Sequence, residues 1–486
     1  MQNERLERIR DEWLEEASIR EMQEKMEKGD VTAEELTVMY LSRISEYGRN
    51  VNAVLEVNPD ALQIARQLDY ERQVKGARSP LHGIPVLLKD NMDTGDKMHT
   101  SCGSLALADH YAAEDAFLVK KLREAGAVIL GKTNMTEWAN FMSDKMTNGY
   151  SSRGGQVKSP YGQFDCGGSS SGAAVAVAAN LAAASVGTET TGSIIEPAVQ
   201  NSLVGIKPTV GAISRAGVIP LSVTQDIPGP LARDVESALL MFREMVGEDP
   251  ADPVTSLSDV WEGRDWEACL DPDALNGARI GVARNIFENE ADSRIQDLFD
   301  RKLDVLKACG AEIIDDIDLG VMENDLGYDV LMHEFKAAVN AYLGKTPASN
   351  PIRTLSDVIE FNSQHPEETL KFGQNMLEQS DRTSGTLTER AYLEALERNR
   401  HLSSEVALER AFREHDISAL VFPQSHGLSF GAAAGYPGVA VPAGKTEEGE
   451  PFGIAFYGRA FAEPLLIGFA CAFEQREKGR VKPPNE

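Results

Sequence analysis

The sequence of 486 residues is 42% apolar and carries 76 acidic against 48 basic residues, which gives a net charge of −28. A chain of this length can bury a large core, and so acidic a surface repels nucleic acid and anionic membranes. Because the N-terminus has no apolar leader and no apolar run reaches about 18 residues, we expect a cytoplasmic protein that neither spans a membrane nor binds nucleic acid.

The first 70 residues are predicted to form a helical layer that packs on the rest of the chain. Residues 3–28 combine helical charge patterning with a thin apolar stripe, which predicts a helix. A second helix begins after Thr32, because Glu35 three residues later completes a capping box.

From Leu81 onward, short apolar runs alternate with helical segments, which is typical of an α/β core with crossover helices. A helix is expected at 115–125. Strands are expected at 84–88, 127–130, 280–283, 312–314, 419–422 and 438–441. We interpret 71–486 as one α/β domain in which a mostly helical region at about 322–415 lies over the sheet and roofs the active site.

The segment 166–211 is almost free of charge in a chain that is otherwise rich in it. It contains Ser169, Ser170, Ser171 and Ser193, each close to glycine. The Ala/Val run at 173–184 predicts a buried helix whose N-terminus points at the serine triplet and favours negative charge there.

Lys89 ends the apolar strand LHGIPVLLK. Burial at a strand end disfavours its ammonium form, and side chains that follow one another in a strand face opposite ways, so Asp90 is not expected to contact it. An exposed lysine that simply ends a strand is the alternative for this residue taken alone.

These stretches together resemble the amidase signature family. The resemblance rests on LHGIPVLLKDNMDT (81–94), on the Gly-Gly-Ser-Ser-Ser-Gly run (167–172), on Thr-Glu-Thr-Thr-Gly-Ser-Ile (188–194) and on AAAGYPGVAVPAG (432–444). Ser169 and Ser193 lie 24 residues apart, which is similar to the spacing in that family. The resemblance implies an α/β protein with the amidase signature fold, a large mixed twisted β-sheet covered by helices on both faces.

The resemblance also implies roles for individual residues. Ser193 corresponds to the nucleophile, Ser169 to a bridging serine beside a cis peptide bond, and Lys89 to the terminal base of a Ser-cisSer-Lys triad. The backbone N–H groups of Thr190, Thr191, Gly192 and Ser193 correspond to the oxyanion hole. Substrate-facing positions are Trp138, Asn140, Phe141 and Ser170, with core packing as the alternative for the two aromatic residues.

The chain departs from the family pattern around the nucleophile. Glu189, Thr191 and Ile195 stand where the commoner pattern has Asp, Gly and Arg, so an Asp–Arg pair cannot form. The Thr-Glu-Thr form is more similar to the peptide-amidase branch. The hydroxyl of Thr191 and the acidic Glu196 leave the substrate preference open.

These features predict an amide hydrolase of peptide-amidase-like or broad specificity, a monomer or homodimer that acts on small-molecule or peptide amides through a Ser193 acyl-enzyme. The alternatives are the glutamine-hydrolysing component of a tRNA-dependent amidotransferase, a carbamate or aryl acylamide hydrolase, and a non-catalytic binding relative. No cofactor and no metal are expected, because there is no CxxC pair, HExxH spacing or phosphate-binding loop. A nucleophile elbow at Ser170 with His426 is disfavoured, because the segment before Ser170 is polar and broken by Pro and Gly.

Overall fold

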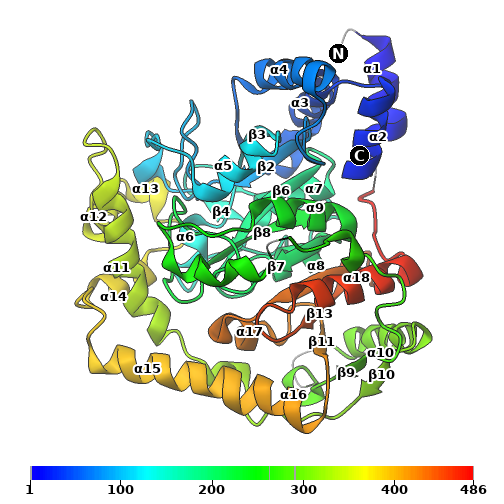
Figure 1. Cartoon of the computed structure of the whole chain (residues 1–486). Helices are drawn as coiled ribbons and strands as arrows, with labels where there is room; N and C mark the ends of the chain where they lie inside the picture. The colour runs from blue at the N-terminus through cyan, green and yellow to red at the C-terminus, as the bar shows by residue number, and fades with distance from the viewer. Residues whose placement is uncertain (1–2, 262, 289–291, 485–486) are drawn as a thin grey trace.

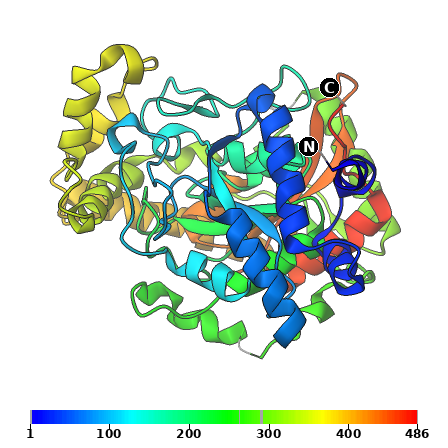
Figure 2. The same cartoon turned by 90° about the horizontal axis from the view of Figure 1, so that it is seen from above.

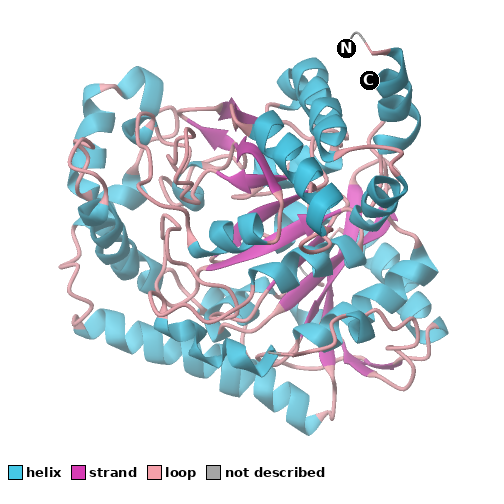
Figure 3. Ribbon diagram, turned by 45° about the horizontal axis from the view of Figure 1, so that its top comes forward, coloured by secondary structure: helices cyan, strands magenta, loops and turns pink. Residues whose placement is uncertain are grey.

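A mixed sheet of eleven strands runs through the protein in the order β1-β3-β2-β6-β8-β7-β12-β13-β11-β9-β10 (Figures 1 and 3). The computed structural model describes residues 3–261, 263–288 and 292–484. The strands of this sheet are β1 (Val54–Val57), β2 (Pro85–Lys89), β3 (Val128–Thr133), β6 (Ala184–Glu189), β7 (Val204–Lys207), β8 (Ile227–Ala232), β9 (Arg279–Gly281), β10 (Glu312–Ile314), β11 (Ala419–Pro423), β12 (Gly438–Lys445) and β13 (Pro451–Tyr457). All six strands predicted from the sequence are present. A separate short hairpin joins β4 (Tyr150–Ser151) to β5 (Gly155–Gln156).

Helices pack on the sheet, and the strand order explains why they take both faces. The chain passes from β2 through α5 to β3, which lies on one side of β2, and then through α7 to β6, which lies on the other side. Both neighbours are parallel to β2. Because crossovers between parallel strands are right-handed, opposite directions of travel place α5 and α7 on opposite faces.

Some of the remaining helices complete the two layers on the sheet. Others form an N-terminal group and a peripheral group (Figure 1). The helices are α1 (Glu4–Ile9), α2 (Ile19–Lys28), α3 (Ala33–Val51), α4 (Ala61–Lys75), α5 (Phe117–Glu124), α6 (Glu137–Asn140), α7 (Ser171–Ala178), α8 (Ile195–Gln200), α9 (Val235–Met245), α10 (Ser293–Ala308), α11 (Asp329–Lys345), α12 (Leu355–Gln364), α13 (Pro366–Thr369), α14 (Asn375–Asp381), α15 (Arg390–Arg400), α16 (Arg410–Glu414), α17 (Leu428–Ala434) and α18 (Glu463–Glu477). None of the helices in the described ranges is long and apolar enough to cross a lipid bilayer.

The N-terminal segment is helical but not as one helix. The predicted helix over 3–28 is wrong in its continuity, because the chain turns after the π-helical turn Arg10–Leu14, with Glu16 at a left-handed φ of 64°, and restarts where Ser18 caps α2. The predicted capping box of α3 is confirmed: Thr32 Oγ1 accepts from Glu35 N at 3.1 Å, and Glu35 Oε2 accepts from Thr32 N at 3.1 Å. α3 and α4 then lie side by side (Figure 2).

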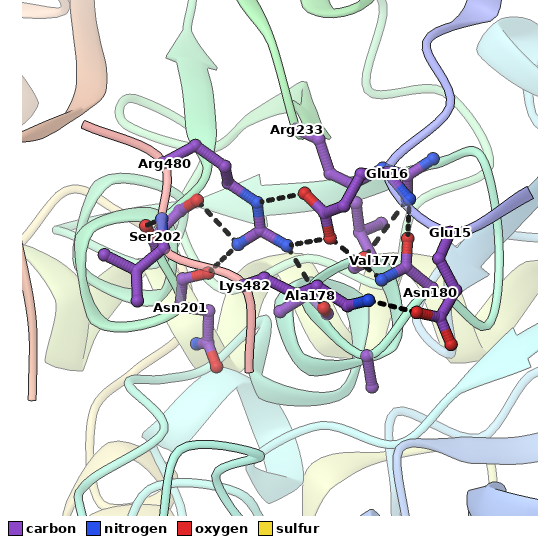
Figure 4. Close-up of polar contacts among 12 residues, drawn as sticks. Glu15, Glu16, Val177, Ala178, Asn180, Asn201, Ser202, Arg233, Arg480 and Lys482 are labelled. Atoms are coloured by element: carbon purple, nitrogen blue, oxygen red, sulfur yellow. Dashed lines mark hydrogen bonds and ion pairs between the residues drawn. The ribbon is translucent and has the colours of Figure 1, made fainter. Parts of the chain in front are cut away.

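The predicted helix over 173–184 is wrong at its end, since α7 stops at Ala178 and Ala184 already begins β6. Three arginines from distant parts of the chain bind the carbonyl groups at this end of α7, and Figure 4 labels two of them, Arg233 and Arg480. Arg480 donates to Ala178 O at 3.2 Å, Arg233 to Val177 O at 3.2 Å and Arg43 to Asn180 O at 2.8 Å. Helix C-termini carry unpaired carbonyls and partial negative charge, so cations are favourable there.

Glu16 offsets part of the positive charge of these arginines, because both of its carboxylate oxygens accept from Arg480 at 3.0 Å (Figure 4). Arg480 thereby ties the C-terminal tail, the N-terminal helices and the end of α7 to one another. The two termini accordingly lie near each other at the edge of the molecule (Figure 1).

Helices α11 to α15 form a peripheral cover on one side of the sheet, drawn from yellow-green to orange in Figure 1. A second hydrophobic cluster joins this cover to the core. It contains Trp138 and Phe141 from the central part and Phe335, Val339 and Leu355 from α11 and α12.

Candidate active site

Lys89 lies at the carboxyl end of β2, between the parallel strands β3 and β6, and its side chain is completely buried. Its Nζ donates to Ser169 Oγ at 2.8 Å and to Ser170 Oγ at 3.0 Å. Thr188, at the end of β6, supplies two more acceptors, its Oγ1 at 2.9 Å and its carbonyl at 3.2 Å. Ligand sites of α/β sheets form at the carboxyl ends of strands, where this lysine meets the serines.

The amine of Lys89 is surrounded by hydroxyl and carbonyl groups, and no ion pair of this residue is found within the described ranges. Burial lowers its pKa from 10.5 to about 7, although the negative charges of Asp226 and Glu189 act in the opposite direction. Asp90 faces away and binds Gly103 N at 3.0 Å and the hydroxyl of Ser101. A buried amine with this pKa is present as free base in a large fraction at neutral pH.

Ser169 and Ser170 stand at the start of α7. The Gly168–Ser169 peptide bond is cis, and Ser169 O accepts from Thr136 N at 3.0 Å. Gly172 in the first turn of α7 is needed for close approach, because a Cβ there would lie 2.2 Å from Asn134 O. This contact presses the serine-bearing turn against the loop that follows β3.

Ser170, one of the positions predicted to face substrate, lies in the interior beside Lys89. Its Oγ donates to Thr188 O at 3.1 Å and accepts from Thr188 N at 3.2 Å. The segment that precedes α7 is loop, so the strand that a nucleophile elbow at Ser170 requires is missing there.

Ser193 ends the loop 190–193, which together with Ile194 connects β6 to α8, and 7% of its surface is exposed. It is not among the hydrogen-bond partners of Lys89 Nζ, all of which come from Ser169, Ser170 and Thr188. Gly192 has a φ of 83°, and a Cβ on it would meet Leu428 at 2.8 Å, so this position requires glycine.

Glu189 has a role that the sequence did not reveal. Its Oε2 accepts from the backbone N–H groups of Ile194 at 2.7 Å and of Ile195 at 3.0 Å. These amides stand at the start of α8, whose first N–H groups have no partner within the helix. The carboxylate of Glu189 therefore binds the two amides that follow Ser193, and it does so although position 195 is isoleucine and not arginine.

Two further residues that sequence reasoning missed, Gln225 and Asp226, lie against the same loop. Asp226 Oδ1 accepts from Thr190 Oγ1 at 2.5 Å, and Gln225 Nε2 donates to Thr190 O at 3.2 Å. Burial raises the pKa of Asp226 to about 6. The segment VTQDIPGP gave no signal of its own, because neither residue belongs to a pattern with known chemistry.

The expected pocket residues Trp138, Asn140 and Phe141 lie on and directly after α6, a single turn in which Trp138, Ala139 and Asn140 all have a left-handed φ. Trp138 and Phe141 are buried and pack on Phe335 of α11 at centroid distances of 6.1 and 5.2 Å. Asn140 is exposed. The two rings thus pack between the core and the cover, and a role toward substrate stays a prediction for them.

Glu196 lies in the first turn of α8, and its Oε1 accepts from Asn148 Nδ2 at 3.3 Å. Burial and the nearby charge of Asp165 raise its pKa to about 7. Glu196, three residues from Ser193, thus has a carboxyl group whose pKa is close to neutral pH, in the first turn of this helix.

A cavity of about 670 Å³ lies between the loop 215–226 and α11. It is lined by Arg215, Asp226 and Tyr342 among others, whereas Lys89, Ser169 and Ser193 do not line it. The cavity therefore adjoins the Ser193 loop through Asp226 and does not contain the lysine and serines. In the described part of the chain, no group of three or more His, Cys, Asp or Glu side chains is arranged to hold a metal ion.

Comparisons with known sequences and structures identify the family and the fold of this chain. The sequence model of the Amidase family matches residues 35–432. A probable amidase of Arabidopsis thaliana is 41% identical, over 97% of this chain and 92% of that protein. The X-ray structure of native peptide amidase from Stenotrophomonas maltophilia is 40% identical and has a TM-score of 0.90, covering 96% of this chain and 98% of that one. A glutamyl-tRNA(Gln) amidotransferase component from Thermoanaerobacter pseudethanolicus is 32% identical, over 96% of this chain and 97% of that protein.

The fold and the family match together define a hydrolase that acts on amides. The chain belongs to the amidase family, and its architecture is the amidase signature fold expected from the sequence.

Proposed function

We propose that Ser193 is the nucleophile, that Ser169 relays its proton and that Lys89 is the terminal base. The neutral amine of Lys89 takes the proton of Ser169 Oγ while Ser169 takes that of Ser193, and Ser193 Oγ attacks the amide carbon. The relay then runs in reverse: Lys89 returns a proton to Ser169, and Ser169 donates one proton to the leaving nitrogen as the C–N bond breaks. Water next attacks the acyl carbon and gives one proton to Ser169, which passes its own to Lys89, and the relay returns a proton to Ser193 Oγ as the ester bond breaks. The observation that carries this proposal is the 2.8 Å contact between the buried Lys89 Nζ and Ser169 Oγ.

The oxyanion that forms on the substrate carbonyl needs donors, and we place them at the backbone N–H groups of Thr190, Thr191, Gly192 and Ser193. The left-handed Gly192 supports this placement, since it turns the loop between β6 and α8. Loss of one such donor costs about 2.7–4 kcal/mol of transition-state stabilisation in comparable sites.

The substrate class that we propose is a carboxamide of peptide-amidase type, which releases ammonia and leaves a free carboxylate. The similarity to a peptide amidase at 40% identity, against 32% for the amidotransferase component, favours this class over the glutaminase alternative. Glu189 and Ile195 support the same choice, because they replace the Asp and Arg expected of that component. The protein would act as a monomer or homodimer without other chains.

The test has two arms. Purified protein is treated with a serine-directed fluorophosphonate and the labelled residue is identified by mass spectrometry, with Ser193→Ala as the control. Ammonia or amine release is then measured from N-acetyl-phenylalanine amide, an aliphatic amide, an anilide and a carbamate.

We expect labelling of Ser193 only, ammonia release from the peptide amide, and complete loss of both in folded Ser193→Ala. Labelling elsewhere, or substantial turnover by Ser193→Ala, would refute the nucleophile. A wild-type protein that neither acylates nor releases ammonia or amine would support the non-catalytic relative.

A further inference from the structure

Two neighbouring side chains at the end of the segment 221–226, those of Gln225 and Asp226, bind the loop 190–193. The two carboxylate oxygens of Asp226 accept from different partners. Oδ1 accepts from the hydroxyl of Thr190 at 2.5 Å, whereas Oδ2 accepts from the backbone N–H groups of Leu221 at 2.7 Å and Ser222 at 2.9 Å. Asp226 therefore closes its own turn and binds the loop with the same carboxylate.

Gln225 makes the second connection. Its Nε2 donates to the carbonyl of Thr190 at 3.2 Å and to Thr191 Oγ1 at 3.2 Å, and only 7% of its surface is exposed. The Thr190–Thr191 peptide bond is trans, so the N–H of Thr191 points away from the carbonyl of Thr190. A side chain that fixes this carbonyl consequently fixes the direction of the Thr191 N–H.

The segment that carries both residues is itself anchored in the helical cover. Glu334 of α11 is completely buried and accepts from Ser222 Oγ at 2.5 Å, from Thr224 N at 3.1 Å and from Thr224 Oγ1 at 3.0 Å. Tyr392 of α15 donates to the same carboxylate at 2.8 Å. Contacts on both sides of the segment thus limit its movement.

We propose that Gln225 and Asp226 are positioning residues that aim the backbone donors of Thr190 and Thr191 at the developing oxyanion. This inference rests on the proposed function, because it presumes that the loop 190–193 forms the oxyanion hole. Donors aimed at the oxyanion act mainly in the transition state, so their misplacement lowers kcat more than it raises KM.

The experiment uses Gln225→Leu, which keeps the size of the side chain but cannot donate, together with the pair Thr190→Val and Thr190→Ser. Asp226 is left unchanged, because its charge also acts on the pKa of Lys89. The matched control is Gln374→Leu. Gln374 is 5% exposed, and within the described ranges its amide binds groups of the cover, such as Asn362 and Ser363. For each variant, kcat and KM for N-acetyl-phenylalanine amide, the rate of labelling by the fluorophosphonate and the melting temperature are measured.

We expect Gln225→Leu and Thr190→Val to lower kcat about 10- to 100-fold with KM changed less than threefold, and to slow labelling in parallel. Thr190→Ser keeps the hydroxyl and should be clearly less impaired than Thr190→Val, whereas Gln374→Leu should stay within threefold of the wild type. If Gln225→Leu does not fold, the threonine pair decides alone.

Folded variants that keep kcat within twofold, or a Thr190→Ser as impaired as Thr190→Val, would overturn the inference while the proposed function stands. A wild-type protein that is not labelled at Ser193 would instead remove the proposed function.

Discussion

The buried amine of Lys89 leads to a prediction about the pH dependence of the reaction. An ordinary lysine of pKa 10.5 is neutral in about one molecule in 3,000 at pH 7, whereas Lys89, with a pKa of about 7, is neutral in about half. The shift corresponds to about 5 kcal/mol in favour of the free amine. Because only the free amine accepts a proton, kcat/KM should rise about tenfold per pH unit below pH 7 and level off above pH 8.

Lys89→Met removes the amine and keeps an apolar side chain of similar length. We expect it to lower kcat/KM by about 10²- to 10⁴-fold, the range typical of a lost general base, and to remove the rise with pH. The assay is ammonia release from N-acetyl-phenylalanine amide between pH 5.5 and 9.5, with circular dichroism at each pH to confirm that the fold is kept.

Lys207→Met is the matched control, because Lys207 is equally buried and burial lowers its pKa to about 8, yet its Nζ binds the carbonyls of Gly431 and Tyr436 and no serine. A folded Lys207→Met should keep kcat/KM and its pH profile within a few-fold. The reasoning is refuted if the wild-type profile is flat or falls between pH 6 and 8, or if Lys89→Met keeps more than a tenth of the activity.

Three predictions concern the framework. Arg480→Met should lower the free energy of unfolding by about 2–3 kcal/mol in urea denaturation, since Glu16 and the Ala178 carbonyl each lose a charged hydrogen-bond donor; a loss below about 0.5 kcal/mol would show that the cluster is not stabilising. Thr32→Ala should cost about 1 kcal/mol in the same measurement, because it removes the acceptor for Glu35 N, and Thr32→Ser should restore most of it. Gly172→Ala should lower both the melting temperature and ammonia release, because its Cβ would lie 2.2 Å from Asn134 O; an unchanged variant would contradict the close approach of α7 to the loop after β3.

Several features of the fold followed from local patterns. The apolar runs that ended in Lys89 and before Gly131 predicted β2 and β3, and the pair Thr32 and Glu35 predicted the start of α3. Signals of this kind lie within a few residues of the elements that they specify, so one sequence is enough to find them. The continuous helices expected at 3–28 and 173–184 failed for the opposite reason. Their breaks depend on distant partners, such as Arg480 at the end of α7.

The same division applies to the site. The sequence by itself determined the family and which lysine and serines to examine, because Lys89, Ser169 and Ser193 stand in recognisable motifs. Only the tertiary structure decided that the amine of Lys89 is fully desolvated, that Glu189 caps α8, and that Gln225 and Asp226 hold the loop beside Ser193. A pKa and a loop position depend on what surrounds a group in space. Ser169 and Thr188 contact Lys89 from 80 and 99 residues away along the chain, and Gln225 contacts Thr190 from 35 residues away.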